Sequence, residues 1–267
     1  MLQAAEHSLL SMPNLSQIQA LHKRFKPESQ FAMLGDVSSI LLKESINPNR
    51  LEKAFLSISS RLGIDFETYF ELGLDADVAL LYIDICSFSS RYAELSSEDL
   101  SDFLDEYYNL IIPIIYEYGG EVDRIMGDGI VAVFGPPFLD GDLYKGIYKA
   151  FCCALHVTGL TNNTQFFSKV ALHAGSIRYY RNKSSYYPEY TIIGKPITEL
   201  YRLESVAEDR TVTYYGKSAV DKLIEKIRLE RPDVLTDKGL LSFIGPVILK
   251  SPLKGVNYSS TKSIIRQ

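Results

Sequence analysis

The sequence predicts an α+β fold, and three neighbouring stretches of the chain support this prediction. A short apolar run at residues 78–85 is rich in strand-forming residues. Residues 96–118 then show the apolar spacing of a helix, and residues 121–134 show a hairpin pattern with Gly-Asp-Gly at its turn. Strands and helices are therefore mixed along the chain, as they are in an α+β domain.

The length and composition indicate one catalytic-sized domain with an extension before it. The chain has 267 residues, of which 46% are apolar and 23% are charged, a balance typical of a globular protein with a sizeable core. We expect the domain at residues 71–267 and an N-terminal helical extension at residues 1–70. The extension is weakly patterned, and its helices are expected near residues 15–25 and 48–61.

Charge and cysteine content argue against several classes of protein. The net charge is -5 and no long Lys/Arg block occurs, so nucleic acid is not an expected partner. The three cysteines, Cys86, Cys152 and Cys153, suit neither a disulfide framework nor a zinc site, which favours a reduced cytoplasmic protein. The N-terminus lacks a signal-peptide pattern, and no apolar run reaches the roughly 18 residues of a membrane span, so we expect no membrane insertion.

The elements before the hairpin follow from local signals. The strand at residues 78–85 is apolar at nearly every position, which predicts burial on both faces of a sheet. A helix start is expected at Ser96-Ser97-Glu98-Asp99 and a stop at Gly119-Gly120. Pro113 lies inside this helix and predicts a kink.

The elements after the hairpin complete the predicted topology. We expect a helix at residues 141–160, a strand at 169–180, a strand ending near Ile193 and a helix at 195–207 with Pro196 in its first turn. A strand at 211–215, a helix at 217–227 and two C-terminal strands follow. The order strand, helix, strand, strand, helix, strand predicts a ferredoxin-like βαββαβ sheet with added C-terminal strands.

The hairpin turn presents a carboxylate, Asp128, at the tip of an otherwise apolar segment. Asp-Gly is a common turn signal, so Asp128 taken alone is explained as a turn residue. A second lone carboxylate, Asp84, lies at the C-terminal end of the first apolar strand. Two strands that each present a carboxylate could hold divalent metal, which gives Asp128 a functional interpretation as well.

Four segments together resemble the landmark segments of class III nucleotidyl cyclase domains. They are YIDICSFS, GGEVDRIMGDGIVAVFG, VALHAGSI and TIIGKPITELYRLES, in the order and with the spacing of that family. The resemblance extends over about residues 76–215. Asp84 and Asp128 are 44 positions apart, which is the separation usual in the family.

The resemblance implies that Asp84 and Asp128 bind two divalent ions, Mn²⁺ or Mg²⁺, with the Ile85 backbone carbonyl as a third contact. Mg²⁺ takes hard oxygen ligands, often one or two protein carboxylates plus substrate phosphates. A pair of such ions can clamp the attacking and leaving oxygens of a displacement at phosphorus. This chemistry explains why the turn carries an acid.

The resemblance also implies residues for the sugar and the phosphates. Arg202 corresponds to the transition-state arginine of the family, and its alternative is an ordinary surface arginine of a helix. The position four residues earlier, where the family has Asn, is Thr198, whose hydroxyl is shorter but can donate and accept. Lys254 is the best candidate for a triphosphate contact, with Lys250 as its competitor; either could be a solvated lysine.

The predicted base-selecting positions hold Arg124 and Thr191, which match neither the adenine nor the guanine pair of the family. An arginine only donates, so it suits carbonyl or ring-nitrogen acceptors of uracil, cytosine or guanine. Thr191 could donate or accept. Alternatively, Arg124 merely pairs with Asp123 or Glu121 on the hairpin.

These departures, with a single compact domain, resemble the bacterial pyrimidine cyclases of antiphage defence. The resemblance implies conversion of UTP, or alternatively CTP, to cyclic UMP or cyclic CMP, a second messenger that a separate effector protein detects. It also implies a homodimer, in which the metal carboxylates of one subunit face Arg202 and the base residues of the other. A purine cyclase and a catalytically silent nucleotide-binding dimerisation module remain open alternatives.

Overall fold

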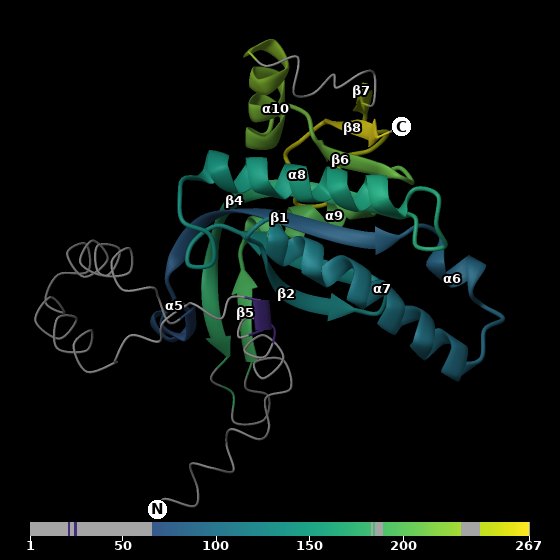
Figure 1. Cartoon of the computed structure of the whole chain (residues 1–267). Coiled ribbons are helices and arrows are strands. Elements are labelled where there is room, and N and C mark those ends of the chain that lie inside the picture. Colours follow the sequence, from purple (N-terminus) through teal and green to yellow (C-terminus); the bar gives the residue numbers. More distant parts are fainter. Residues whose placement is uncertain are drawn as a thin grey trace, which may run out of the picture. The chain divides into compact units, whose positions relative to one another are not determined.

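A computed structural model of the chain describes Leu21, Arg24, Phe25 and residues 66–182, 184, 189–230 and 241–266 (Figure 1). Most of the predicted N-terminal extension, including the helix expected at 48–61, lies outside the described residues; Leu21, Arg24 and Phe25 are helical. The chain divides into two compact units. One comprises Met1–Leu74 and Tyr179–Thr191, and the other comprises Asp75–Arg178 and Ile192–Gln267.

The second unit contains the predicted ferredoxin-like core. Its elements are β1 (Asp75–Ile85), α7 (Ser97–Glu117), β2 (Glu121–Met126), β3 (Gly129–Phe134), α8 (Leu143–Thr161) and β4 (Ser168–Asn182), whose last residues belong to the first unit. These strands lie in the order β2-β3-β1-β4, and β1 runs antiparallel to both β3 and β4. The α+β fold and the βαββαβ order predicted from the sequence are therefore confirmed.

The C-terminal elements widen this sheet. They are β5 (Glu189–Ile193), α9 (Lys195–Glu204), β6 (Thr211–Tyr215), α10 (Ala219–Glu230), β7 (Leu241–Ile248) and β8 (Ser260–Arg266). The sheet continues from β4 through β6 and β8 to β7, and β5 pairs with β4. A short helix that the sequence pattern did not predict, α6 (Phe88–Arg91), follows β1.

The helix ends follow the predicted signals. Ser96 caps α7 by accepting from the Asp99 backbone N–H at 3.1 Å, and Gly119 follows the helix with a φ of 85°. Pro113 lies within α7, and the kink expected there stays a prediction. Asp142 caps α8 in the same way, accepting from the Lys145 N–H at 2.9 Å.

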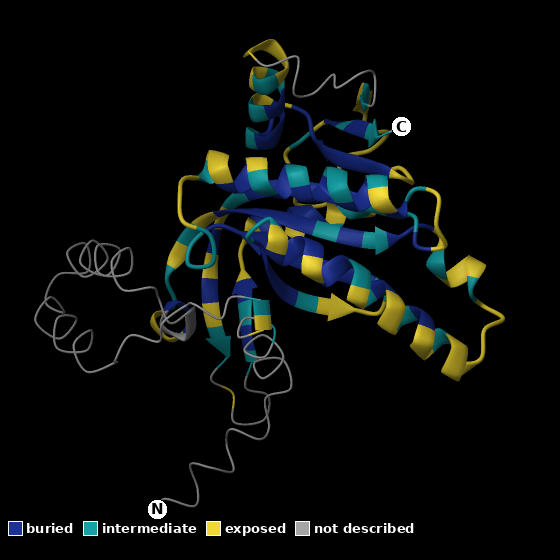
Figure 2. Ribbon diagram, viewed as in Figure 1, coloured by how far each residue is buried: buried dark blue, intermediate teal, exposed yellow. Residues whose placement is uncertain are grey.

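The core lies between the sheet and helices α7 and α8, as Figure 2 shows by burial. Every residue of β3 is buried, and so are four consecutive residues of β1, Val78 to Leu81. Helix α8 contacts β1, β3, β6 and β8. Among the described residues, no helix is long and apolar enough to cross a bilayer.

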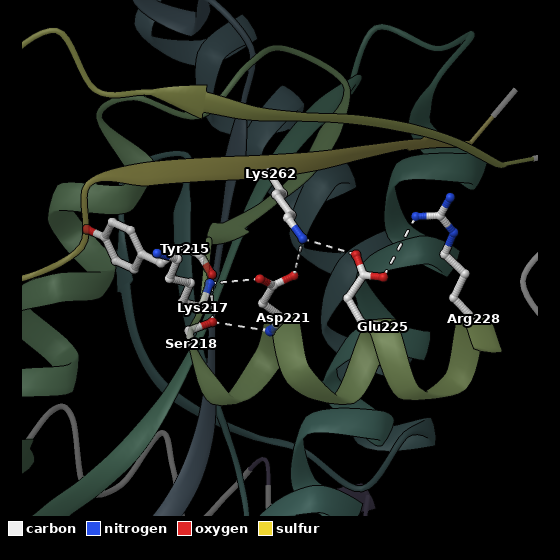
Figure 3. A network of polar contacts seen from close by, with 7 residues as sticks. All are labelled: Tyr215, Lys217, Ser218, Asp221, Glu225, Arg228 and Lys262. Carbon is white, nitrogen blue, oxygen red and sulfur yellow. Dashed lines mark hydrogen bonds and ion pairs between the residues drawn. The ribbon is translucent and has the colours of Figure 1, made fainter. Parts of the chain in front are cut away.

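Ion pairs connect α10 to β8 at the widened end of the sheet (Figure 3). The Lys262 Nζ lies 2.7 Å from Asp221 Oδ1 and 3.0 Å from Glu225 Oε1. Asp221 also accepts from the Lys217 backbone N–H at 2.7 Å. The acidic groups are thus neutralised by neighbours, so this network fastens the helix to the strand.

Within the first unit, α5 (Phe66–Leu72) packs its aromatic residues against the 179–191 segment. Tyr69 and Phe70 make edge contacts with the Tyr179 ring, at centroid distances of 5.4 Å and 4.9 Å. Glu71 accepts from the Tyr190 hydroxyl at 2.7 Å and pairs with Arg181. Helix α5 is therefore held against the 179–191 segment by aromatic packing and by the contacts of Glu71.

Candidate active site

Asp84 and Asp128 meet at one end of the sheet. Asp84 is the penultimate residue of β1, and Asp128 lies in the turn between β2 and β3. Because β1 pairs with β3 through Ile83 and Ile130, the turn lies beside the end of β1. Ile85 ends β1 directly after Asp84, so its carbonyl belongs to the same strand end.

The two carboxylates share a partly buried site. Burial first, and then the charge of Asp128, raise the pKa of Asp84 to about 7, while Lys169 opposes the rise. Burial also raises the pKa of Asp128, while hydrogen bonds from its own backbone and from Asp84 oppose that rise. Burial disfavours the ionisation of both carboxylates, so a bound cation would offset that cost, and the pair forms a site suited to one.

Lys169 is a neighbour of Asp84 that no sequence pattern indicated. It lies opposite Asp84 in the β1–β4 register, with its Nζ 3.4 Å from Asp84 Oδ2 and 2.8 Å from Glu204 Oε1. Nearby acids raise the pKa of this lysine although burial lowers it. Only the strand pairing reveals the contact, because 85 positions of sequence separate the two residues.

Two tyrosines support the turn that carries Asp128. The Tyr108 hydroxyl of α7 donates to the Gly127 carbonyl at 2.5 Å, and Gly127 has a φ of 61°. The Tyr82 ring covers Gly129 so closely that a Cβ there would lie 2.6 Å from it. The turn therefore needs both glycines, one for its conformation and one for space.

Thr198 and Arg202 lie on an exposed face of α9. Lys195 is exposed on the same face, whereas Leu200 and Leu203 are buried on the opposite one. Within the part of the chain that the structure describes, the Arg202 side chain makes no hydrogen bond and no ion pair. Its charge is therefore available to an anion, although its predicted role stays a prediction.

His173 and Tyr215 both contact Glu199 of α9. The His173 Nε2 lies 3.0 Å from Glu199 Oε2, and the Tyr215 hydroxyl donates to the Glu199 carbonyl at 2.9 Å. His173 is buried, and burial lowers its pKa while Glu199 opposes the change. This histidine is therefore a core residue, and its contact with Glu199 helps to position α9.

The predicted base-selecting residues lie in different units. Arg124 is in β2, and its Nε donates to Asp123 Oδ2 at 2.6 Å, so the pairing considered as an alternative does form. Thr191 is in β5, in the first unit, and is half-buried. Its base-reading role stays a prediction.

Lys254 and Lys250 lie between β7 and β8 and are both exposed. Their positions do not favour one over the other. Among the described residues, no group of three or more His, Cys, Asp or Glu side chains forms a metal cluster. The protein thus offers two carboxylates, and a bound Mg²⁺ commonly completes its shell with water and substrate phosphates.

The sequence matches one curated protein over a short stretch. It is 33% identical over 57 residues to an adenylate cyclase of Dictyostelium discoideum described as terminal-differentiation specific. That stretch is 21% of this chain and only 3% of the relative, so most of the relative has no counterpart in the match. No family model matches the chain.

The fold is similar to that of solved cyclase domains. The guanylate cyclase domain of RhGC from Catenaria anguillulae, in complex with GTP, superposes with a TM-score of 0.57 at 16% identity and covers 73% of this chain and 99% of that chain. For the adenylyl cyclase CyaB from P. aeruginosa the TM-score is 0.54 at 20% identity, with coverage of 73% and 96%. For the non-canonical dimeric guanylyl cyclase domain of RhoGC from Blastocladiella emersonii it is 0.55 at 14%, with coverage of 72% and 98%.

The chain therefore has the fold of the class III nucleotidyl cyclase catalytic domains, as the resemblance of the four segments implied. Identities of this size establish the fold alone. What the chain does depends on its own site residues.

Proposed function

We propose that this protein is a metal-dependent nucleotidyl cyclase. The reaction is attack of a 3′-hydroxyl on the α-phosphorus of a nucleoside triphosphate, which forms a 3′,5′-cyclic monophosphate and releases pyrophosphate. The observation that carries the proposal is the meeting of Asp84 and Asp128 at one end of the sheet, in a partly buried site. A module that only binds nucleotide has no evident need for this costly pair of carboxylates.

Two divalent ions, Mn²⁺ or Mg²⁺, fit this donor set. Asp84, Asp128 and the Ile85 carbonyl would hold them through hard oxygen atoms. When bound, the ions would lower the pKa of the 3′-hydroxyl and neutralise the triphosphate. Lys169 keeps the Asp84 carboxylate in place through its bridge to Glu204.

The remaining chemistry falls to exposed polar side chains. Arg202 would bind the charge that develops on the α-phosphate, since a guanidinium remains charged and donates from a fork of N–H groups. Thr198 would orient the ribose through its hydroxyl. Lys254, or Lys250 in its place, would bind the outer phosphates.

For the base we propose a pyrimidine, with UTP favoured over CTP. Arg124 offers donors to a base carbonyl, and Thr191 would donate to or accept from a neighbouring edge group. The product, cyclic UMP, would act in antiphage defence as a messenger for a separate effector protein. GTP is the next candidate, because one structural neighbour was solved with GTP and guanine also carries a carbonyl.

We further propose a homodimer with two shared sites. The metal carboxylates of one subunit would face Arg202 and Thr198 of the other, which agrees with the exposure of both residues on α9. One of the structural neighbours is described as dimeric. A two-fold axis would build two equivalent sites.

The test is incubation of the full chain with ATP, GTP, CTP and UTP separately in the presence of Mn²⁺, with products resolved by chromatography and mass. We expect cyclic UMP and pyrophosphate from UTP, and no product from Asp84→Asn or Asp128→Asn. Asp102→Asn, which alters an exposed carboxylate of α7, is the matched control and should retain activity. A cyclic purine nucleotide as product would support the cyclase activity and overturn the assignment of a pyrimidine base. No cyclic product from any nucleotide would favour the catalytically silent module.

A further inference from the structure

Arg124 follows an irregularity in β2 that brings it against its own neighbour. The β2–β3 register shifts between Val122 and Arg124, which makes Asp123 the extra residue of a β-bulge. Successive side chains of a regular strand point to opposite faces. The bulge removes this alternation, and the Asp123 carboxylate accepts from Arg124 Nε at 2.6 Å.

The Asp123–Arg124 pair is asymmetric in exposure. The Asp123 side chain is only 4% exposed, whereas the Arg124 side chain is 27% exposed. A buried carboxylate thus compensates the guanidinium charge at its Nε side, while the other four N–H donors of the group are on its two Nη atoms. Arg124 is therefore less suited to a phosphate than an uncompensated cation and better suited to a neutral acceptor.

Tyr201 of α9 is a second hydrogen-bond partner of the same guanidinium. Its hydroxyl accepts a hydrogen bond from Arg124, since a guanidinium cannot accept; burial raises the pKa of this hydroxyl and Arg124 opposes the rise. The Tyr201 ring in turn packs edge-on against Tyr82, with centroids 5.5 Å apart. An oxygen that accepts from Arg124 leaves the phenol O–H to donate elsewhere.

We propose that Asp123 and Tyr201 are specificity-determining residues, which hold Arg124 so that its guanidinium and the Tyr201 hydroxyl recognise the carbonyl edge of a nucleobase. This inference rests on the nucleotide site proposed above and deepens it. The Arg124 guanidinium and the Tyr201 hydroxyl would both act as donors. They suit uracil, cytosine or guanine, each of which has a carbonyl acceptor, and disfavour adenine, which presents an amino group instead.

The adjacent Arg202 has the complementary task. It follows Tyr201 directly on α9 and, among the described residues, has no acid to compensate it. Arg124, whose charge Asp123 compensates, is thus assigned to the base, and Arg202, whose charge no acid compensates among the described residues, is assigned to the phosphates. The two arginines are assigned by their charge environment and not by their residue type.

The experiment measures binding of the α,β-methylene analogues of UTP, CTP, GTP and ATP to the full chain by calorimetry with Mn²⁺. These analogues separate affinity from turnover, because the bond that cyclisation breaks is replaced. The variants are Tyr201→Phe, which keeps the ring against Tyr82, and Asp123→Asn, which keeps the size of the side chain. Tyr144→Phe, at a 54% exposed tyrosine of α8, is the matched control.

In the wild type we expect the UTP analogue to bind at least about tenfold more tightly than the ATP analogue, a ratio equivalent to one good hydrogen bond. Each of the two variants should weaken the UTP analogue by about tenfold and leave the ATP analogue within roughly twofold. The control should keep the wild-type ratio. In steady-state assays, KM for UTP should rise more than kcat falls.

An equal loss for all four analogues in both variants, or equal affinity of the wild type for the UTP and ATP analogues, would overturn the inference. Selective binding of the UTP analogue by a wild type that makes no cyclic nucleotide would instead refute the proposed activity and support base recognition by Arg124 and Tyr201. Unchanged melting temperatures in the variants would confirm that the readout concerns recognition. A wild type that binds none of the analogues would overturn both proposals.

Discussion

At the scale of single residues, the candidate metal site depends on side chains outside the set that binds metal. The Tyr108 hydroxyl of α7 donates to the carbonyl of Gly127, the residue directly before Asp128. Its pKa is raised mainly by burial and then by the charge of Asp128, which places it near that carboxylate. Tyr108 therefore acts as a positioning residue for the turn.

Removing that hydroxyl should weaken metal binding and leave the fold in place. For Tyr108→Phe we expect Mn²⁺ affinity, measured by calorimetry on the full chain, to fall about fivefold to tenfold, the size of one lost hydrogen bond. Tyr144→Phe should bind Mn²⁺ like the wild type. Unaltered Mn²⁺ affinity in Tyr108→Phe would show that the β2–β3 pairing alone fixes the turn.

The sequence predicted the residues of the site better than their contacts. Asp84 and Asp128 could be found because each interrupts an apolar pattern, and the strand pairing brings them together. Lys169 and Tyr201 could not be found in this way, since each looks like an ordinary polar residue of its element. Their contacts depend on a cross-strand register and on the packing of α9 against β1.

At the scale of elements, strand and helix signals agreed closely with the structure. The strand at 211–215 was predicted with its observed bounds, and the α7 helix within one or two residues. The β-bulge in β2 was not predictable, because nothing in the local sequence requires the register shift at Asp123. Helix α6 was missed because four residues are too few for a periodic pattern.

The hairpin that presents Asp128 gives a test with two neighbouring glycines. Gly129→Ala places a Cβ 2.6 Å from the Tyr82 ring and should cost about 1–3 kcal/mol of unfolding free energy. Gly127→Ala meets nothing within 4 Å but keeps a φ of 61°, so only backbone strain of about 1–2 kcal/mol is expected. Denaturant unfolding of the metal-free full chain measures both changes.

The same pair should separate more clearly in function than in stability. Displacement of Tyr82 affects both the Asp84 end of β1 and Tyr201, so Gly129→Ala should lose most Mn²⁺ binding. Gly127→Ala should keep measurable binding, because no side chain has to move. Equal Mn²⁺ affinities in the two variants would contradict the role given to the Tyr82 ring.

At the scale of the whole molecule, the proposed site divides into two halves that a two-fold axis would bring together. Asp84 and Asp128 belong to the metal half, and Arg202 belongs to the other half. Asp84→Ala and Arg202→Ala proteins should each be inactive alone. Mixed and exchanged in equal amounts, about half of the dimers would be heterodimers with one intact site of two, so activity should recover to about a quarter of the wild type.

Mixing Asp84→Ala with Asp128→Ala is the control that makes this result specific. Both changes lie in the metal half, so every site of a heterodimer would lack one carboxylate and no activity should return. Recovery in the first mixture alone requires that each site draws its two halves from different subunits. If subunit exchange is verified by mass and neither mixture recovers activity, both halves of each site belong to one subunit. The exposure of Arg202 and Thr198 on α9 would then need an explanation other than a shared site.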